Sequence, residues 1–196
     1  MKTIGITGGV GSGKSMVLDM LSQNYNCDII KADDVAKGMY NIGSKAYNSI
    51  LDLFGEDILN EDKSVNKKML ADILFKNDRK RLALNSIIHP MVKQEIIKRV
   101  TGNKIENKFD YTFVECALLL EEHYDVFCDE TWYITASENI RRERLKLSRN
   151  YSDEKIDGIF ASQKSDEEFK ENVDYVIDNS KDPETTFETV RKLLNN

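Results

Sequence analysis

Eight consecutive residues near the start of the chain constrain its fold more than any other feature. Residues 8–15 read Gly-Gly-Val-Gly-Ser-Gly-Lys-Ser and satisfy every fixed position of the pattern G-x-x-x-x-G-K-[ST]. The glycines let the backbone curl so that successive N–H groups point at one anion. The lysine can then reach the outer phosphates, and the last serine hydroxyl can bind Mg²⁺. The segment therefore predicts a phosphate-binding loop.

The residues on either side of this loop support the same interpretation. Residues 2–7 form a strand-like run, and apolar residues recur at helical spacing after the loop. A helix that begins there favours an anion at its N-terminus. The alternative, a glycine-rich turn without a ligand, fits this strand–loop–helix context poorly. We expect a nucleoside triphosphate to be bound by Gly9, Val10, Gly11, Ser12, Gly13, Lys14, Ser15 and Met16, with Ser15 also at Mg²⁺.

Strand-like runs and helical patterns alternate along the whole chain. The strands are expected at 2–7, 28–32, 110–116, 131–136 and 174–178. This alternation predicts an α/β fold, a P-loop NTPase-type parallel sheet with helices on both faces. Ligands bind such sheets at the carboxyl ends of the strands. The gap between the second and third strands is longer than a simple crossover needs, so we expect inserted helices at 44–54, 66–76 and 80–100.

The expected organisation is one kinase-like domain covering residues 1–196 with two helical additions. Its core comprises 1–33, 108–137 and 173–196, the insertion 34–107 forms an acceptor-binding region, and 138–172 forms a lid. The lid contains a cluster of arginines. Any one of them could belong to a solvated helix face, but phosphoryl transfer needs cations over the transferred group. The cluster consists of Arg141, Arg142, Arg144 and Arg149.

Composition narrows the choice of partners and compartment. The net charge is -6 and the isoelectric point is about 5.1, which disfavours nucleic acid as a partner. No run approaches the roughly 18 apolar residues of a membrane span, and the chain begins with a strand rather than a signal peptide. The three cysteines lack C-x-x-C spacing, and Cys116 reads as a buried thiol rather than a nucleophile. We expect a cytoplasmic protein with small-molecule substrates and no obligate protein partner.

Acidic residues at the ends of two predicted strands are candidates for chemistry. Asp33 follows the second strand and could accept the proton of an attacking hydroxyl, although Asp33 or Asp34 could instead cap a helix that starts at Val35. Glu115 ends the third strand and could hold Mg²⁺ through water or serve a structural partner. His89, which precedes a proline, could contact an anionic substrate or fill a kink.

Two short patterns imitate the guanine-nucleotide signatures of GTPases. Residues 52–55 match D-x-x-G and residues 107–110 match N-K-x-D. The first lies in an amphipathic helical stretch rather than at a strand end, and the second precedes a strand rather than following one. Because such short patterns arise readily by chance, they do not predict a GTPase.

Motifs spread over nearly the whole chain resemble those of the dephospho-coenzyme A kinase family. The phosphate loop alone is shared by many enzymes, whereas the ordered set is more specific. The matching segments are Ile6–Ser15, Ala32-Asp33, Leu53-Phe54-Gly55 with Ile58-Leu59, His89-Pro90, Leu118–Glu121, Arg144-Leu145, Gln163 and Asp174–Asn179.

This resemblance implies ATP-dependent phosphorylation of the ribose 3′-hydroxyl of dephospho-CoA, which gives CoA and ADP. It implies Asp33 as the general base, with Lys14 and Arg144 stabilising the phosphoryl group and Ser15 holding Mg²⁺. Arg144 and Asn179 would also bind ATP, and the segment after Asn179 would pass near the adenine. The acceptor would be bound by Thr7, Asp33, His89 and Glu115.

The chain departs from the family pattern around the acceptor and the lid. Two expected lid arginines and a proline are replaced, while the phosphate loop is intact. The departures are Lys31, Lys37, Ala117, Ser148 and Ile159. They leave open a diverged P-loop nucleoside or nucleotide kinase. A nucleotide-dependent switch without a small-molecule acceptor is a further alternative, which the arginine-rich lid and the position of Asp33 disfavour.

Overall fold

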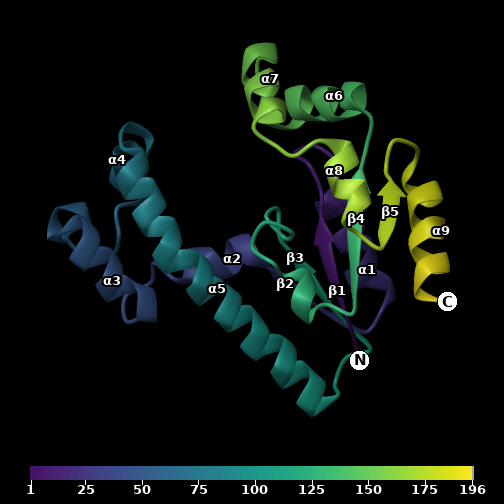
Figure 1. Ribbon diagram of the computed structural model, residues 1–196, viewed down its shortest axis with the longest axis horizontal. Helices are drawn as coiled ribbons and strands as arrows, with labels where there is room; N and C mark the ends of the chain where they lie inside the picture. Colours follow the sequence, from purple (N-terminus) through teal and green to yellow (C-terminus); the bar gives the residue numbers. More distant parts are fainter. Residues whose placement is uncertain (196) are drawn as a thin grey trace. The chain divides into compact units, whose positions relative to one another are not determined.

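The computed structural model describes residues 1–195, which contain a five-stranded sheet. Figure 1 shows its strands among the helices. The strands follow the order β2-β3-β1-β4-β5, and β1 pairs in parallel with β3 and β4, as β4 does with β5. Their bounds are β1 Lys2–Thr7, β2 Cys27–Lys31, β3 Tyr111–Glu115, β4 Glu130–Thr135 and β5 Tyr175–Asp178. This is the parallel α/β sheet that the alternating pattern predicts.

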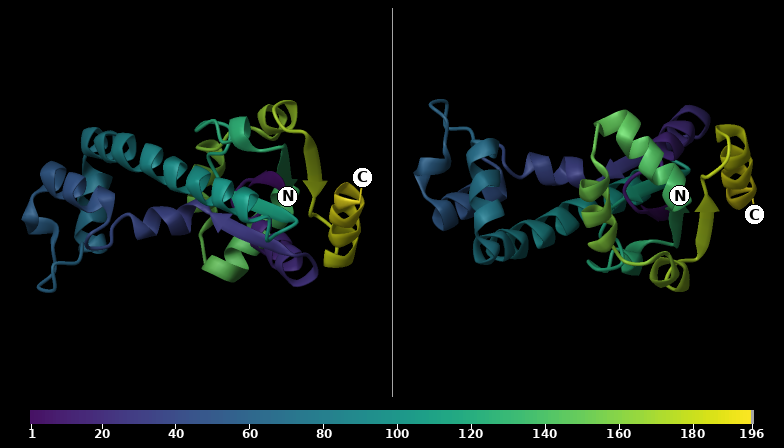
Figure 2. Two further views of the ribbon diagram at one scale, coloured as in Figure 1. Left: turned by 90° about the horizontal axis from the view of Figure 1, so that it is seen from below. Right: turned by 90° about the horizontal axis from the view of Figure 1, so that it is seen from above.

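The contacts within the chain divide it into two compact units. The first comprises Met1–Ile29 with the residues from Asn103 onward, and the second comprises Ile30–Gly102. Around the sheet of the first unit lie α1 Lys14–Asn24, η2 Asp125–Phe127, α6 Glu138–Arg149, α7 Asp153–Ala161, α8 Asp166–Glu171 and α9 Pro183–Leu194. Figure 1 shows α6 and α7 beyond the carboxyl ends of β4 and β5, and both views of Figure 2 show α9 beside β5.

The core of the first unit is formed by the sheet and two of its helices. Buried and exposed residues do not alternate in β1 and β4, where five of the six residues in each strand are buried. This is expected for central parallel strands that are covered on both faces. The strands contribute Ile4, Ile6, Phe113, Trp132, Ile134 and Ile177, α1 contributes Val17, Leu18 and Leu21, and α9 contributes Val190. This packing fixes the edge of the sheet from which the loop after β1 emerges.

The second unit is helical. It contains α2 Ala32–Gly38, α3 Lys45–Phe54, η1 Glu56–Ile58, α4 Lys67–Lys76 and most of α5 Asp78–Glu106. Figures 1 and 2 show α3 and α4 gathered at the N-terminal end of α5. Ser44 and Asn66 cap α3 and α4, since their side chains accept hydrogen bonds from Tyr47 N and Met69 N.

Most predicted element boundaries agree with the structure within about two residues, but α5 does not. We expected a helix over 80–100, whereas α5 runs from Asp78 to Glu106 and continues through Pro90. A proline inside a helix removes one backbone hydrogen bond, and the surrounding buried positions Ile88, Val92 and Ile96 offset that loss by packing. None of the helices in residues 1–195 combines the length and apolar character that crossing a bilayer requires.

Candidate active site

The loop between β1 and α1 adopts a conformation that only glycine accommodates easily. Gly11 and Gly13 have φ values of 83° and 92°, in the left-handed region. Helix α1 starts at Lys14, directly after Gly13, as the sequence predicts. The Ser12 N–H donates to the carbonyl oxygen of Gly9 at 3.2 Å, which closes the loop on itself. The loop therefore ends at a helix N-terminus, the backbone environment that favours a phosphate group.

Lys14 lies over the loop that precedes it. Its Nζ donates to the carbonyl oxygen of Gly8 at 2.6 Å and lies 3.9 Å from Glu115 Oε1. Glu115 reaches this position because it pairs with Ile6 at the end of β3, one residue before β1 ends. Both side chains are about 15% exposed, so little solvent screens their charges. A cation and a carboxylate thus meet at the carboxyl edge of the sheet, beside the predicted phosphate site.

Asn179 connects the loop to two other elements of the first unit, β4 and α9. Its side-chain amide donates to Ser12 O at 2.7 Å, its Oδ1 accepts from the Thr186 hydroxyl at 3.0 Å, and its backbone N–H donates to Thr135 O at 2.7 Å. The side chain is completely buried. Asn179 therefore braces the loop from behind, which adds a structural role to the ATP contact that we predict for it.

Two arginines of α6 contact the outward-facing carbonyl groups of the loop. Arg144 donates to Ser12 O at 3.2 Å and to Asn179 O at 2.9 Å, and Arg141 Nε donates to Val10 O at 2.9 Å. They are three residues apart, so they project from the same face of the helix. In a loop whose N–H groups converge on an anion the carbonyls point away from it. Here α6 satisfies two of them with cationic side chains.

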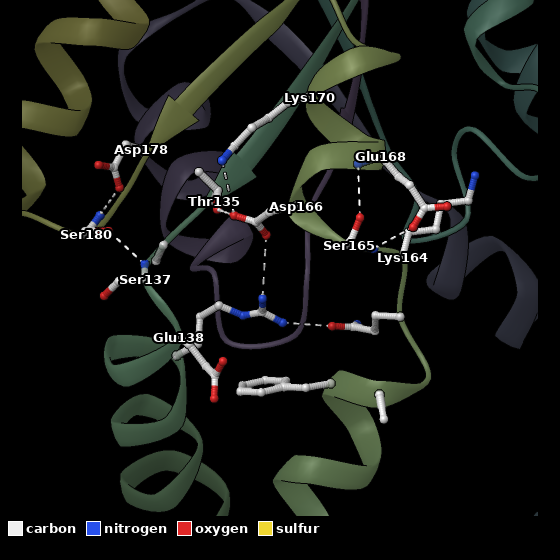
Figure 3. Close-up of a pocket in the computed structure, with 15 residues that line it drawn as sticks. Thr135, Ser137, Glu138, Lys164, Ser165, Asp166, Glu168, Lys170, Asp178 and Ser180 are labelled. Carbon is white, nitrogen blue, oxygen red and sulfur yellow. Dashed lines mark hydrogen bonds and ion pairs between the residues drawn. The ribbon is translucent and has the colours of Figure 1, made fainter.

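A cavity of about 700 Å³ lies beside Arg141, lined by residues of α6, α7 and α8 and of the segments that follow β4 and β5 (Figure 3). Figure 3 shows Asp166 directed toward Thr135 and Lys170. Its carboxylate accepts from Tyr133 Oη at 2.6 Å and from Thr135 Oγ1 at 3.0 Å. Burial alone would raise the pKa of Asp166, but these two hydrogen bonds and nearby Lys170 outweigh it and lower that pKa. Asp166 is therefore a fixed negative charge in this wall.

The remaining predicted site residues lie in different surroundings. Thr7 is completely buried and its hydroxyl donates to Ala117 O at 3.3 Å. Ser15 is exposed in the first turn of α1, where Met16 packs against the core. Asp33 is exposed in the first turn of α2, and His89 is half-buried in α5; both belong to the second unit. The roles assigned to these residues stay predictions.

The alternative role of the two aspartates as helix caps is wrong. Helix α2 starts at Ala32, three residues before the expected Val35, and its N-cap is Lys31, which makes no side-chain capping bond. Asp33 and Asp34 therefore lie inside the first turn, where a negative charge stabilises the positive end of the helix dipole. Asp34 also pairs with Lys37 at 2.6 Å.

Sequence reasoning did not select Gln163, which contacts the loop at Val10, or Asp166, which lines the cavity. Gln163 could have been found because it matches the family pattern. The capping box of Ser165 and Glu168 marks the start of α8, where Asp166 lies.

The structure agrees with the rejection of the two GTPase-like patterns. The D-x-x-G pattern ends α3 and the N-K-x-D pattern precedes β3, so neither has the position that a GTPase requires.

A parallel sheet of this strand order, a phosphate-binding loop between β1 and α1, and an arginine-bearing helix against that loop define a P-loop kinase. The family model described as Dephospho-CoA kinase matches residues 2–184. The chain belongs to the dephospho-CoA kinase family.

Individual members of this family match the chain over nearly their full length. The dephospho-CoA kinase of Carboxydothermus hydrogenoformans is 37% identical over 195 residues, which cover 97% of this chain and 92% of the relative. That of Oceanobacillus iheyensis is 33% identical over 183 residues, covering 93% and 91%. The solved dephospho-CoA kinase of Campylobacter jejuni has a TM-score of 0.72 at 21% identity, covering 98% of each chain, and supports the fold.

Proposed function

We propose that the chain transfers the γ-phosphoryl group of ATP to the ribose 3′-hydroxyl of dephospho-CoA, which yields CoA and ADP. The observation that carries this proposal is the family match over residues 2–184 together with an intact phosphate loop. The proposed substrates are therefore two small molecules. The three free cysteines, none of them in a disulfide, support a reducing compartment such as the cytoplasm.

Residues 8–15 and the cations around them are proposed to bind the triphosphate. The converging N–H groups at the start of α1 supply a site for the β-phosphate. Lys14 would exchange its contact with Gly8 O for phosphate oxygens, since its flexible side chain already lies over the loop. Arg144, held at Ser12 O and Asn179 O, adds positive charge from the lid. Phosphoryl transfer depends mainly on such positioning and charge.

Asp33 is proposed as the general base that accepts the proton of the attacking 3′-hydroxyl. Its carboxylate is exposed in the first turn of α2, directly after β2, and ligands of parallel sheets bind beyond the carboxyl ends of the strands. A carboxylate can accept the proton of a hydroxyl as that hydroxyl attacks the phosphoryl group. Glu115 and His89 are proposed to contribute to acceptor binding, and Thr7 to shape the same edge.

The residues near the loop suit a magnesium ion bound mainly by phosphates and water. Mg²⁺ prefers oxygen ligands and usually keeps several waters, and the exposed hydroxyl of Ser15 is such a ligand. In residues 1–195 no three His, Cys, Asp or Glu side chains gather into a cage for a metal. We propose that Ser15 holds Mg²⁺ with ATP, where the ion neutralises charge on the β- and γ-phosphates.

The domain roles follow the same division. We propose that the helical insertion 34–107 binds dephospho-CoA and that 138–172 is a lid over ATP. In support, the second unit contains a cavity of about 690 Å³ between α2, the loop that follows it, and α5, with Met39, Met91 and Lys98 among its lining residues. A cavity that combines apolar and cationic side chains suits an acceptor with a long organic arm and phosphate groups.

An acceptor panel tests the proposed function. ADP release would be followed with ATP and Mg²⁺ and either dephospho-CoA, nucleosides or nucleoside monophosphates as the acceptor. Rapid release with dephospho-CoA alone supports the proposal. Turnover with a nucleoside and none with dephospho-CoA would contradict it, and would identify Lys31, Ser148 and Ile159 as marks of changed specificity.

A further inference from the structure

We infer that Arg141 and Gln163 form a clamp on the peptide groups of Val10, and that this clamp positions the phosphate-binding loop for ATP. The inference rests on the proposed ATP site at residues 8–15. It assigns these two lid residues a positioning role, because the hydrogen bonds that they make to the loop are all with its backbone.

The clamp is a closed triangle of hydrogen bonds. The Val10 N–H donates to Gln163 Oε1 at 3.3 Å, and Arg141 Nε donates to Val10 O at 2.9 Å. Arg141 also donates from its terminal nitrogen to Gln163 Oε1 at 2.8 Å. One residue of the loop is therefore held through both its donor and its acceptor by two side chains that also hold each other. Gln163 Oε1 accepts from both the Val10 N–H and Arg141, so removal of that oxygen breaks two sides of the triangle.

The composition of the loop explains why such a clamp is needed. Four of its eight residues are glycine, and glycine loses more conformational freedom on ordering than any other residue. A loop that samples many conformations presents its N–H groups to phosphate only part of the time, and its apparent affinity falls by that fraction. Contacts that fix the loop from outside raise the population of the binding conformation.

Gly9 provides the space that the clamp occupies. A Cβ atom built at Gly9 would lie 2.5 Å from one terminal nitrogen of Arg141 and 2.7 Å from its Cζ. The φ of Gly9 is not among the positive values that mark Gly11 and Gly13, so its backbone conformation is open to alanine. The role of this glycine is therefore close approach of the guanidinium group, and its replacement displaces Arg141 specifically.

The guanidinium group is itself held on the side away from the loop. Its Cζ lies 4.3 Å from the centroid of the Phe160 ring, and one terminal nitrogen lies 4.0 Å from Asp166 Oδ1. Asp166 is fixed to β4 by the hydroxyls of Tyr133 and Thr135. The Arg141 side chain is only 12% exposed, so its charge is weakly screened. The clamp thus connects the loop to the sheet through the lid.

The neighbouring Arg142 is a natural control. Its guanidinium group pairs with Glu138, Asp153 and Asp157 at 2.7 to 3.1 Å. None of these partners belongs to the loop. A methionine at either position keeps most of the aliphatic side chain and removes the donors. Arg142→Met therefore loosens the lid to a similar extent without touching Val10.

The experiment measures the Kd for ATP, the KM for dephospho-CoA and the thermal midpoint of the wild type and of four variants. Arg141→Met and Gln163→Leu are each expected to raise the Kd for ATP roughly tenfold, the worth of a hydrogen bond to a charged group. The double variant should raise it by far less than the roughly hundredfold product, because the two residues act as one unit. The KM for dephospho-CoA should change less than about twofold, and Arg142→Met should leave the Kd for ATP within about twofold.

A second cycle tests the geometry of the clamp. Gly9→Ala should raise the Kd for ATP roughly tenfold in the wild type and less than about twofold in Arg141→Met, where no guanidinium group is left to displace. Unchanged ATP affinity in both single clamp variants overturns the inference. An equal loss of ATP affinity in Arg142→Met and Arg141→Met overturns it too, because it indicates a general effect of the lid. A wild type that fails to bind ATP contradicts the proposed function itself.

Discussion

The side-chain amide of Asn179 donates a buried hydrogen bond to the carbonyl oxygen of Ser12 at 2.7 Å. These residues are separated by 167 positions, so the end of β5 fixes the shape of a loop near the N-terminus. The same asparagine accepts from Thr186 in α9. The conformation of the phosphate-binding loop therefore depends on residues that lie far from it in the sequence, Asn179 after β5 and Thr186 in α9.

Asn179→Asp should weaken both folding and ATP binding. A carboxylate has the same size but cannot donate to Ser12 O, so two buried acceptor oxygens would face each other. We expect the free energy of unfolding to fall by about 2 kcal/mol and the Kd for ATP to rise. Urea unfolding and ATP titration measure the two effects. Asn172→Asp, at an exposed helix end, should change stability by less than about 0.5 kcal/mol; equal effects of the two variants would argue against the brace.

Gly13→Ala should abolish ATP binding, whereas Gly102→Ala should stabilise the protein. Gly13 has a φ of 92°, and a Cβ there would lie 2.1 Å from Asn179 Nδ2. Gly102 lies in α5 with open space around its Cβ position, so alanine should add about 0.5–1 kcal/mol through helix propensity. Calorimetric unfolding and ATP titration separate the two cases. Normal ATP affinity in Gly13→Ala would rule out the loop conformation described above.

Cys128 should make the protein less stable at alkaline pH. Burial, together with the charges of Asp129 and Asp125, raises the pKa of its thiol to about 12. In the unfolded chain the thiol ionises near about 8.5, so its contribution is fully present below that pH and is lost as pH rises toward 12. Between about pH 7.5 and 10 the loss should be about 1–2 kcal/mol. Urea unfolding at both pH values should show that Cys128→Ala loses less free energy of unfolding than the wild type does. Equal losses in the two proteins would show that the Cys128 thiol is not the cause.

Asp33→Asn tests the proposed general base. Loss of the proton acceptor should lower kcat by about 10²–10⁴-fold while the Kd for ATP changes less than about twofold, because the loop is untouched. Asp34→Asn is the matched control: Asp34 is adjacent, exposed and paired with Lys37, and its loss should change kcat less than about twofold. Steady-state kinetics measure both variants, and nearly wild-type turnover in Asp33→Asn would show that Asp33 is not the general base.

Lys14→Ala should instead impair ATP binding and turnover together.

The sheet and the loop could be predicted because their signals are local. Glycine spacing, helical periodicity and strand-like runs each act over a few residues, and they place β1, α1 and the other strands within one or two positions of the observed ends. The start of α2 was missed because nothing in the run from Lys31 to Asp34 shows that the backbone turns at Ala32 without a capping side chain.

The support behind the loop could not be predicted because it depends on tertiary contacts. Arg141 could be named only as one member of an arginine cluster, and no local pattern distinguishes it from Arg142. The structure separates them: Arg141 donates to Val10 O, and Arg142 pairs with acidic residues of α6 and α7. In the same way, sequence indicates Asn179 only through family resemblance, while its bond to Ser12 needs the strand order of the sheet.

The identity of the product tests the central claim most directly. The purified protein would be incubated with ATP, Mg²⁺ and dephospho-CoA, and the products would be identified by mass spectrometry and phosphorus NMR. We predict one CoA for each ADP, with the new phosphomonoester on the ribose 3′-oxygen, and loss of this product in Asp33→Asn. ADP formed without CoA, or phosphate transferred to any other position, would contradict it.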